Sequence, residues 1–154
     1  MDTTKNRLDE EAREILQAND RGGYTVPTAR LYPYQWNWDS AFVALGFLGF
    51  DRERAWREIE TLFEGQWDNG MVPSILFRRH DPDYFPGANA WGTEHLKMPS
   101  TGISQPPVAA STVLAITESG GEEDRARGSA LMDNLMRFHR WYYEERRDET
   151  TGVI

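Results

Sequence analysis

The residues best suited to chemistry lie in the stretch Tyr32–Asp39 (YPYQWNWD), which packs four aromatic rings, two amides and one carboxylate into eight residues. Side chains two residues apart point in different directions on a helix, so Trp36 and Trp38 do not form one face of a core helix. Flat rings beside a fixed acceptor are typical of a sugar site: the rings cover the apolar face of a pyranose, and Asp39 accepts hydrogen bonds from its hydroxyls. The alternative is that both indoles belong to the core and that Asp39 is the N-cap of the next helix.

Composition narrows the classes of function. The chain has 154 residues, 39% of them hydrophobic and 27% charged, which is typical of a globular protein with one ordinary domain. The net charge of −8 and the scattered Lys and Arg residues argue against nucleic-acid binding. Cysteine is absent, which removes disulfides and thiolate chemistry. The N-terminus lacks the apolar core of a signal peptide, and no apolar run reaches the length of a membrane span, so we expect a cytoplasmic protein without a membrane partner.

Hydrophobic spacing predicts a leading helix followed by two similar pairs of helices. The predicted helices span residues 3–18, 39–49, 51–64, 104–118 and 122–146. The first member of each pair, at 39–49 and 104–118, is apolar almost all round, which implies burial on most sides. The second member of each pair, at 51–64 and 122–146, is amphipathic, so one of its faces should be exposed to solvent. Short connections within each pair predict antiparallel helical hairpins arranged in two layers.

Local signals place several helix ends. Asp51 is the expected N-cap of the helix at 51–64, whose outer face should carry Arg54 and Glu58 among other charged residues. Ser104 is the expected cap of the helix at 104–118, with Pro106 and Pro107 in its first turn.

The segment 65–103 is less regular. Asn69-Gly70 and Pro73 predict a tight loop or a short β-hairpin, and residues 75–77 predict a short strand. Residues 80–102 show no periodicity but include three aromatic residues, Tyr84, Phe85 and Trp91. A loop of this length inside a domain is usually functional or disordered, and its aromatic content favours function.

The two hairpins leave apolar helices that need neighbours on every side. We therefore expect an all-α fold in which residues 1–154 are the N-terminal portion of a single, larger helical toroid, incomplete at the C-terminal end.

Three stretches together resemble the family-63 glycoside hydrolases of bacterial type, especially the mannosylglycerate and glucosylglycerate hydrolases. They are residues 32–39, residues 65–73 (GQWDNGMVP) and residues 101–107 (TGISQPP), in this order. The similarity covers nearly the whole chain and extends to trehalase-like relatives. It implies the N-terminal part of an (α/α)6 barrel and inverting hydrolysis of an α-glycosidic bond by a general-acid Asp and a general-base Glu.

The resemblance carries over half of a substrate pocket but no catalytic residue, because the family's acid and base lie in stretches that residues 1–154 do not contain. The family segment that holds the sugar ring before the cleaved bond matches Tyr32, Trp36, Trp38 and Asp39. Gln105 matches an amide at the start of the next inner helix that reaches the same sugar. Tyr84 matches a mobile-loop tyrosine that closes on the glycerate side. Ser74 stands where relatives often carry histidine, so the group attached to the sugar stays open.

The main hypothesis is an inverting α-glycosidase acting on a small glycoside such as glucosylglycerate or mannosylglycerate. Asp68 invites assignment as an acid, but an Asp-Asn-Gly turn explains it without chemistry. His80 and Asp81 fit no metal template, so no metal site or cofactor is assigned. A small carbohydrate is the expected partner, with a homo-oligomer left open. The alternatives are a non-catalytic sugar-binding helical module, a fragment of a trehalase-like glycosidase, and a helical interaction protein whose tryptophans are all core.

Overall fold

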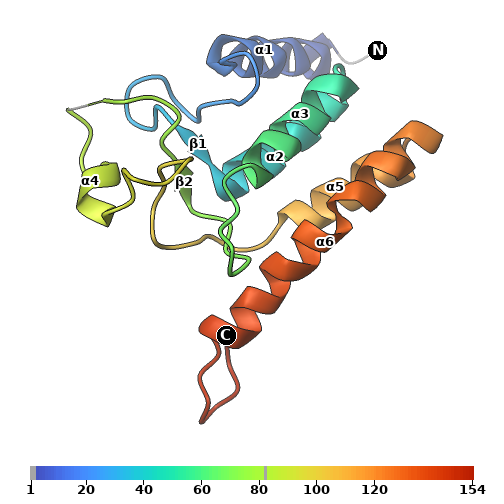
Figure 1. Cartoon of the computed structure of the whole chain (residues 1–154). Coiled ribbons are helices and arrows are strands. Elements are labelled where there is room, and N and C mark those ends of the chain that lie inside the picture. The colour runs from blue at the N-terminus through green and yellow to red at the C-terminus, as the bar shows by residue number, and fades with distance from the viewer. Residues whose placement is uncertain (1–2, 82) are drawn as a thin grey trace.

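The structure, a computed structural model, describes residues 3–81 and 83–154. It is mostly helical, which confirms the expected all-α class (Figure 1). The helices are α1 (Thr3–Asn19), α2 (Asn37–Leu48), α3 (Arg52–Phe63), α4 (Ala88–Trp91), α5 (Ala109–Glu118) and α6 (Glu122–Glu145), and the strands are β1 (Gln35–Trp36) and β2 (Ile75–Leu76).

The two predicted helical hairpins form and pack against each other (Figure 1). Helix α2 packs against both α3 and α5, and α5 packs against α6. As predicted, Asp51 is the N-cap of α3: its Oδ1 accepts a hydrogen bond from the backbone N of Arg54 at 2.9 Å. The side chains buried between the hairpins form one core, which includes Phe47, Trp56, Ile59, Leu62, Val113, Ile116, Leu135, Phe138 and Trp141.

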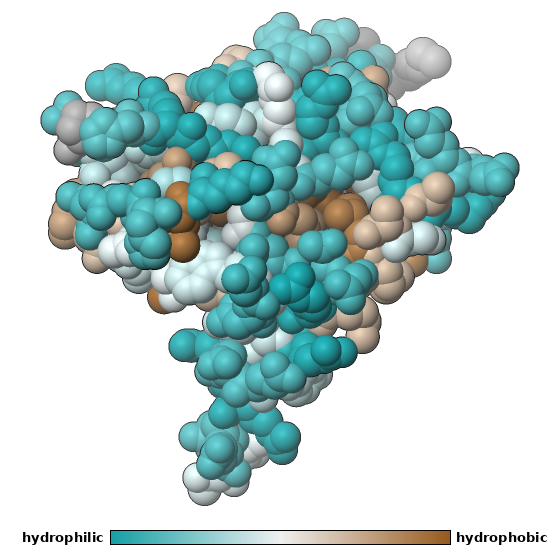
Figure 2. Space-filling model, in the orientation of Figure 1, coloured by the Kyte–Doolittle hydropathy of each residue, from teal (hydrophilic) through white to brown (hydrophobic). Residues whose placement is uncertain are grey.

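The prediction that the apolar helices are buried on most sides is wrong for the described residues. Trp38, Phe42 and Leu45 on α2 are 42%, 57% and 38% exposed, and Leu114 on α5 is 56% exposed. These helices bury the faces that meet their helical neighbours, and their opposite apolar faces are open to solvent. The visible surface is otherwise mostly hydrophilic, with apolar side chains gathered where the two hairpins meet (Figure 2).

Helix α5 begins at Ala109, later than predicted. The residue before a proline is disfavoured in the α conformation, because the proline ring clashes with its backbone. Gln105 precedes Pro106 and Pro106 precedes Pro107, so two successive residues are kept out of the helix. Ser104 is therefore not a helix cap, and residues 104–107 form an irregular segment ahead of α5.

The two strands pair across the chain instead of forming a local hairpin. Strands β1 and β2 are antiparallel, with Gln35 opposite Leu76 and Trp36 opposite Ile75. Of the two alternatives predicted for residues 65–73, the hairpin is wrong, because the partner of β2 lies much earlier in the sequence. The turn at residues 69–70 does form. Gly70 has a φ of +97°, and a Cβ at that position would lie 2.6 Å from the carbonyl oxygen of Arg137.

The backbone of residues 72–74 joins the start of α2 to the segment ahead of α5. The carbonyl oxygen of Val72 accepts hydrogen bonds from Asn37 Nδ2 at 3.0 Å and from Ser104 Oγ at 2.6 Å. The carbonyl oxygen of Ser74 accepts a hydrogen bond from the backbone N of Asn37 at 3.0 Å. The backbone N of Ser74 donates to the carbonyl oxygen of Ile103 at 2.7 Å. Two segments distant in sequence are thus held to one short piece of chain.

Candidate functional site

The stretch Tyr32–Asp39 passes directly from strand β1 into helix α2. Trp36 is the residue before the helix and has an extended backbone, with φ −106° and ψ 144°. Because β2 holds β1 and residues 72–74 hold Asn37, the direction of the chain is fixed on both sides of Trp36. The interpretation that both indoles are core residues fails for Trp38, which is 42% exposed.

Asp39 lies in the first turn of α2 and is half-buried. The N-cap position is Trp36, so the alternative role of Asp39 as a cap is wrong. Burial raises the pKa of the Asp39 carboxyl, because it removes water from the charged form, and a hydrogen bond from its own backbone amide offsets part of that effect. Within residues 3–81 and 83–154, no cation forms an ion pair with this carboxylate. Its oxygens at the helix N-terminus can therefore accept hydrogen bonds from a ligand.

Trp36 lies against aromatic neighbours. Tyr32 packs edge-to-face on it, with ring centroids 5.3 Å apart and an interplanar angle of 82°. Trp36 and Tyr84 pack against the same small cluster, formed by Tyr34, Ile75 and Phe77. The Nε1 of Trp36 is buried without a hydrogen-bond partner among the described residues. An unpaired buried donor destabilises the fold, so the N–H of Trp36 is a candidate donor to a group outside the described residues.

Tyr84 comes from the long loop between β2 and α5. Its ring lies 4.8 Å from that of Tyr34, again edge-to-face. Burial raises the pKa of Tyr84, and the nearby Tyr32 adds to the effect. Tyr84 also lines a small cavity of about 120 Å³, together with Arg79 and Asp81. This tyrosine therefore lies beside the aromatic group of β1.

Gln105 contacts the other side of the stretch. Its Oε1 accepts a hydrogen bond from the backbone N of Trp38 at 3.2 Å. The hydroxyl of Tyr142 donates to the Gln105 carbonyl oxygen, which fixes the backbone there. The expected position at a helix start is wrong, since Gln105 lies in the irregular segment before α5. The expected reach toward α2 is nevertheless present, and no described residue pairs with Gln105 Nε2.

The six predicted residues fall into two groups around the start of α2. Tyr32, Trp36 and Tyr84 lie on the β1 side, and Trp38 and Gln105 lie on the α5 side. Asp39 follows Trp38 in the first helical turn. Gln105 lines a cavity of about 490 Å³. Trp36, Trp38 and Asp39 line neither that cavity nor the one at Tyr84.

Sequence reasoning missed the buried carboxylate that holds this end of α2. Glu58 is fully buried and accepts hydrogen bonds from Ser40 Oγ at 2.5 Å, Thr25 Oγ1 at 2.9 Å and Gln35 Nε2 at 3.3 Å. Arg54 pairs with it at 2.7 Å. The prediction that Arg54 and Glu58 lie on the outer face of α3 is wrong, because each neutralises the other's charge inside the fold. Their i, i+4 spacing beside an apolar face was the available signal.

Neither a metal-binding cluster nor a membrane-spanning helix is found in the described part of the chain. No group of three or more His, Cys, Asp or Glu side chains among residues 3–81 and 83–154 is placed to hold a metal ion. Asp81 pairs with Arg79 at 3.4 Å. None of the described helices combines the length and hydropathy needed to cross a bilayer.

A family model for the mannosylglycerate hydrolase MGH1-like glycoside hydrolase domain matches residues 32–154. The chain belongs to this family. The match begins at Tyr32, so it includes the candidate site and both helical hairpins. The resemblance seen in the sequence is confirmed.

Relatives in the family are named as hydrolases. A mannosylglycerate hydrolase of Thermus thermophilus is 49% identical over 148 residues, which are 94% of this chain and 36% of that protein. The mannosylglycerate hydrolase MGH2 of Selaginella moellendorffii is 46% identical, over 99% of this chain and 32% of the relative. The glucosylglycerate hydrolase of Mycolicibacterium hassiacum is 40% identical, over 98% and 37%. The chain spans about a third of the length of the curated relatives it matches.

Solved structures agree with the fold. The crystal structure of a GH63 mannosylglycerate hydrolase from Thermus thermophilus in complex with Tris and D-glycerate has a TM-score of 0.84 at 46% identity, covering 92% of this chain and 34% of that chain. The complex of that hydrolase with glucose has a TM-score of 0.75 at 47% identity, covering 89% and 33%. The expected fold, the N-terminal part of a helical barrel, is confirmed.

Proposed function

We propose that this chain is part of an inverting α-glycosidase that acts on a small glycoside such as glucosylglycerate or mannosylglycerate. The half-buried Asp39 carboxylate, with no cation partner among the described residues and next to the exposed ring of Trp38, carries the proposal. The family membership supports it, since named relatives hydrolyse mannosylglycerate or glucosylglycerate. Solved relatives hold glucose or D-glycerate, the two halves of glucosylglycerate.

In this proposal the sugar ring lies at the start of α2. The exposed face of Trp38 covers the apolar face of the ring, which removes both from water. The carboxylate of Asp39 accepts hydrogen bonds from adjacent hydroxyls, and charge makes these bonds stronger than neutral ones. Gln105 holds Trp38 through Oε1, so its Nε2 can donate to a further hydroxyl. The buried N–H of Trp36 supplies another donor.

The glycerate end of the substrate is proposed to lie toward Tyr84. Its hydroxyl can donate to a carboxylate or to the glycosidic oxygen. Arg79 lines the same small cavity, and its guanidinium is partly exposed beside Asp81. An arginine in this place offers a planar pair of donors that matches a carboxylate.

Cleavage itself is assigned to residues outside this chain. Inversion needs one carboxylic acid to protonate the leaving oxygen and one carboxylate to activate water on the opposite face, about 6.5–9.5 Å apart. Asp39 is proposed to bind the sugar and to take neither role. We propose that the acid and base follow residue 154, and that residues 1–154 form the N-terminal portion of a single domain. The open apolar faces of α2 and α5 are the surfaces that its remaining helices would cover.

Sugar release tests this proposal. The 154-residue chain should not hydrolyse glucosylglycerate or mannosylglycerate, whereas the protein that also contains the following helices should. In the active protein, proton NMR of the product before mutarotation should show the β-anomer first. Release of the α-anomer first would overturn inversion, and turnover by the 154-residue chain would overturn the assignment of the acid and base.

Calorimetry separates the proposal from a non-catalytic binding module. A module that works alone should bind glucose, mannose or their glycerates with a Kd on the order of micromolar, about −8 kcal/mol. Half of a pocket should bind no tighter than about millimolar, roughly −4 kcal/mol. Micromolar binding by the 154-residue chain would favour the module.

A further inference from the structure

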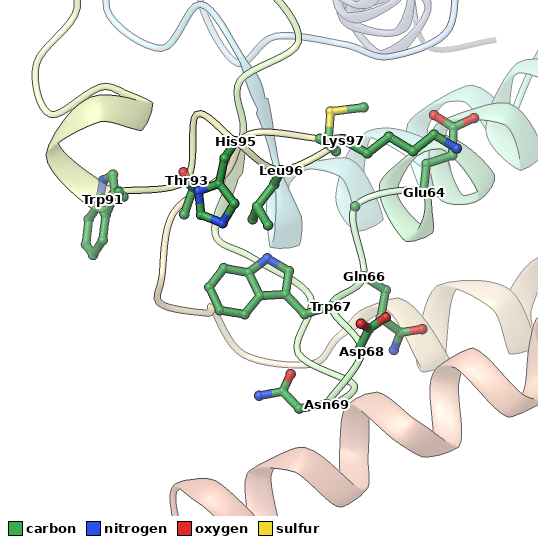
Figure 3. A pocket seen from close by; sticks show the side chains of 13 residues that line it. Glu64, Gln66, Trp67, Asp68, Asn69, Trp91, Thr93, His95, Leu96 and Lys97 are labelled. Atoms are coloured by element: carbon green, nitrogen blue, oxygen red, sulfur yellow. The ribbon is translucent and has the colours of Figure 1, made fainter.

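A cleft outside the proposed site lies between residues 64–69 and residues 91–98, and it encloses about 690 Å³ (Figure 3). None of the six residues assigned to the sugar site lines it. The volume falls within the roughly 300–1,000 Å³ typical of small-molecule sites. One wall is formed by the stretch GQWDN at residues 65–69.

Trp67 supplies a fixed flat surface in this cleft. Its Nε1 donates to Ser100 Oγ at 3.0 Å, which sets the plane of the indole. His95 and Leu96 lie on one side of the indole and Asn69 on the other, with Trp91 across the cleft (Figure 3). A rigid aromatic face binds the apolar face of a sugar at little cost in conformational entropy.

Trp91 adds a second indole to the cleft. Its ring packs on Gly102, where an added Cβ would lie 3.4 Å from the ring. Its Nε1 is buried and has no acceptor among the described residues. Trp91 therefore contributes its ring to the wall of the cleft, on the side opposite Trp67.

The free polar groups of the cleft carry both signs of charge. Asp68 and Lys97 are exposed, and no described residue forms a hydrogen bond or an ion pair with either side chain. Asn69 Oδ1 accepts from the backbone N of Met71 at 3.1 Å, so its Nδ2 is the group left to donate. A lining that holds one lysine together with the carboxylates of Glu64 and Asp68 gives no net preference for an anion. This mixture of donors and acceptors suits the hydroxyls of a neutral sugar better than a phosphate or a carboxylate.

We propose that this cleft is a second saccharide-binding site. It takes a neutral hexose, or the hexosyl part of a glycoside, against Trp67, with Asp68, Asn69 and Lys97 on the hydroxyls. Two carboxylates line the cleft, and Glu64 is already paired with Arg78 at 3.1 Å. Asp68 is then the single unpaired carboxylate among the lining residues, so the proposed role is to retain a sugar without hydrolysing it. It goes beyond the proposed function and does not depend on Asp39.

Indole NMR tests the two sites separately. The chain has six tryptophans, and each indole N–H signal can be assigned by a single Trp→Phe replacement. Titration with glucose and with mannose should shift the Trp67 and Trp91 signals to saturation, equally in the wild type and in Asp39→Asn. The Trp36 and Trp38 signals report on the Asp39 site, so failure of one proposal leaves the other readable.

Exposed variants locate the binding. Asp68→Ala and Lys97→Met should each raise the Kd of the Trp67 and Trp91 response about tenfold, as expected for loss of one hydrogen bond to a charged group. Asp133→Ala, which removes an exposed carboxylate from α6, is the matched control and should leave the Kd unchanged. Shifts that never saturate, or an unchanged Kd in both cleft variants, would overturn the proposal. Saturation by D-glycerate but not by the hexoses would overturn the neutral-sugar assignment.

Discussion

At the scale of single residues, the position of Asp39 lowers the stability of the folded chain. Its carboxylate is half-buried, and no cation forms an ion pair with it among residues 3–81 and 83–154. Burial raises its pKa, so folding disfavours the charged form. A residue that destabilises the folded chain and yet offers carboxylate acceptors to a ligand is typical of a binding site, where function and stability compete.

Asp39→Asn should therefore stabilise the protein near neutral pH. Because the pKa is raised in the folded state, that state binds more protons than the unfolded chain between the ordinary carboxyl pKa and the raised value. Stability falls as pH rises through this window, and the full cost is present at about pH 7. Thermal unfolding followed by circular dichroism should show a higher Tm for the variant at about pH 7 and little difference at about pH 3. Asp133→Asn, an exposed control, should change neither value.

The same substitution should impair catalysis in the protein that contains the whole domain. Loss of charge-assisted hydrogen bonds to the sugar costs about 1.5–3 kcal/mol, so kcat/KM for glucosylglycerate or mannosylglycerate should fall about tenfold to a hundredfold. Steady-state kinetics give the value directly. An unchanged kcat/KM, in a variant with the expected rise in Tm, would remove Asp39 from the sugar site.

The sequence revealed the residues whose chemistry is local and missed those whose partners are distant. Trp36, Trp38 and Asp39 stand together in the chain, so their types and spacing could be interpreted directly. Glu58 has one local partner, Arg54 four residues before it, but its partners Thr25 and Gln35 come from other segments, and its burial depends on all three. Whether a charged residue is exposed or buried depends on such partners, and periodicity alone does not show them.

At the scale of elements, α3 carries both a buried and an exposed carboxylate, which allows a matched comparison. Glu58 is fully buried, accepts hydrogen bonds from Ser40 and Gln35, and forms an ion pair with Arg54. Glu58→Gln leaves the Arg54 charge with less compensation and turns an N–H₂ group toward other donors. We expect a loss of about 3 kcal/mol in the free energy of unfolding by urea. Glu53→Gln, at an exposed pair on the same helix, should cost less than about 1 kcal/mol. Similar losses for the two variants would contradict this account.

The start of α6 should show the opposite pH dependence to Asp39. The Trp56 Nε1 donates to Asp124 Oδ1 at 2.7 Å, and this bond lowers the pKa of Asp124, with help from the backbone of Gly121 and from Arg52. A lowered carboxyl pKa contributes stability above the ordinary value, and this contribution is lost as pH falls through the folded-state pKa. Asp124→Asn should lower the Tm at about pH 7, and the difference from the wild type should shrink toward about pH 2. A constant difference across that range would show that the charge of Asp124 does not contribute.

Helix ends were predicted correctly where a single side chain determines them. Asp51 capped α3 as predicted, because one side chain decides that end. The start of α5 was misplaced because a proline is favourable at the first helical position only when the residue before it stays outside the helix. Two prolines in succession keep Gln105 and Pro106 outside and move the start to Ala109. The pairing of β1 with β2 joins distant segments, which local patterns do not specify.

At the scale of the whole molecule, the open apolar faces predict self-association of the 154-residue chain. Phe42 is 57% exposed beside the exposed Trp38 on α2, with ring centroids 6.0 Å apart, and Leu114 is exposed on α5. Apolar patches of this kind usually bind another surface. Sedimentation velocity should show a weight-average mass that rises with concentration. Phe42→Ser should reduce the rise, whereas Phe85→Ser, at a lone aromatic that is 86% exposed, should not. A monomer at all concentrations would contradict this expectation.

The carbonyl oxygen of Val72 has a consequence for the shape of the proposed sugar site. It accepts hydrogen bonds from Asn37 and from Ser104, the neighbours of Trp38 and Gln105. The following Pro73 restricts Val72 to extended conformations, so the oxygen keeps a narrow range of directions. This one peptide group therefore sets the distance between the Trp38 indole and the Gln105 amide. Pro73→Ala would broaden the spacing between them, and hence the range of sugars accepted, without altering any residue that touches the ligand.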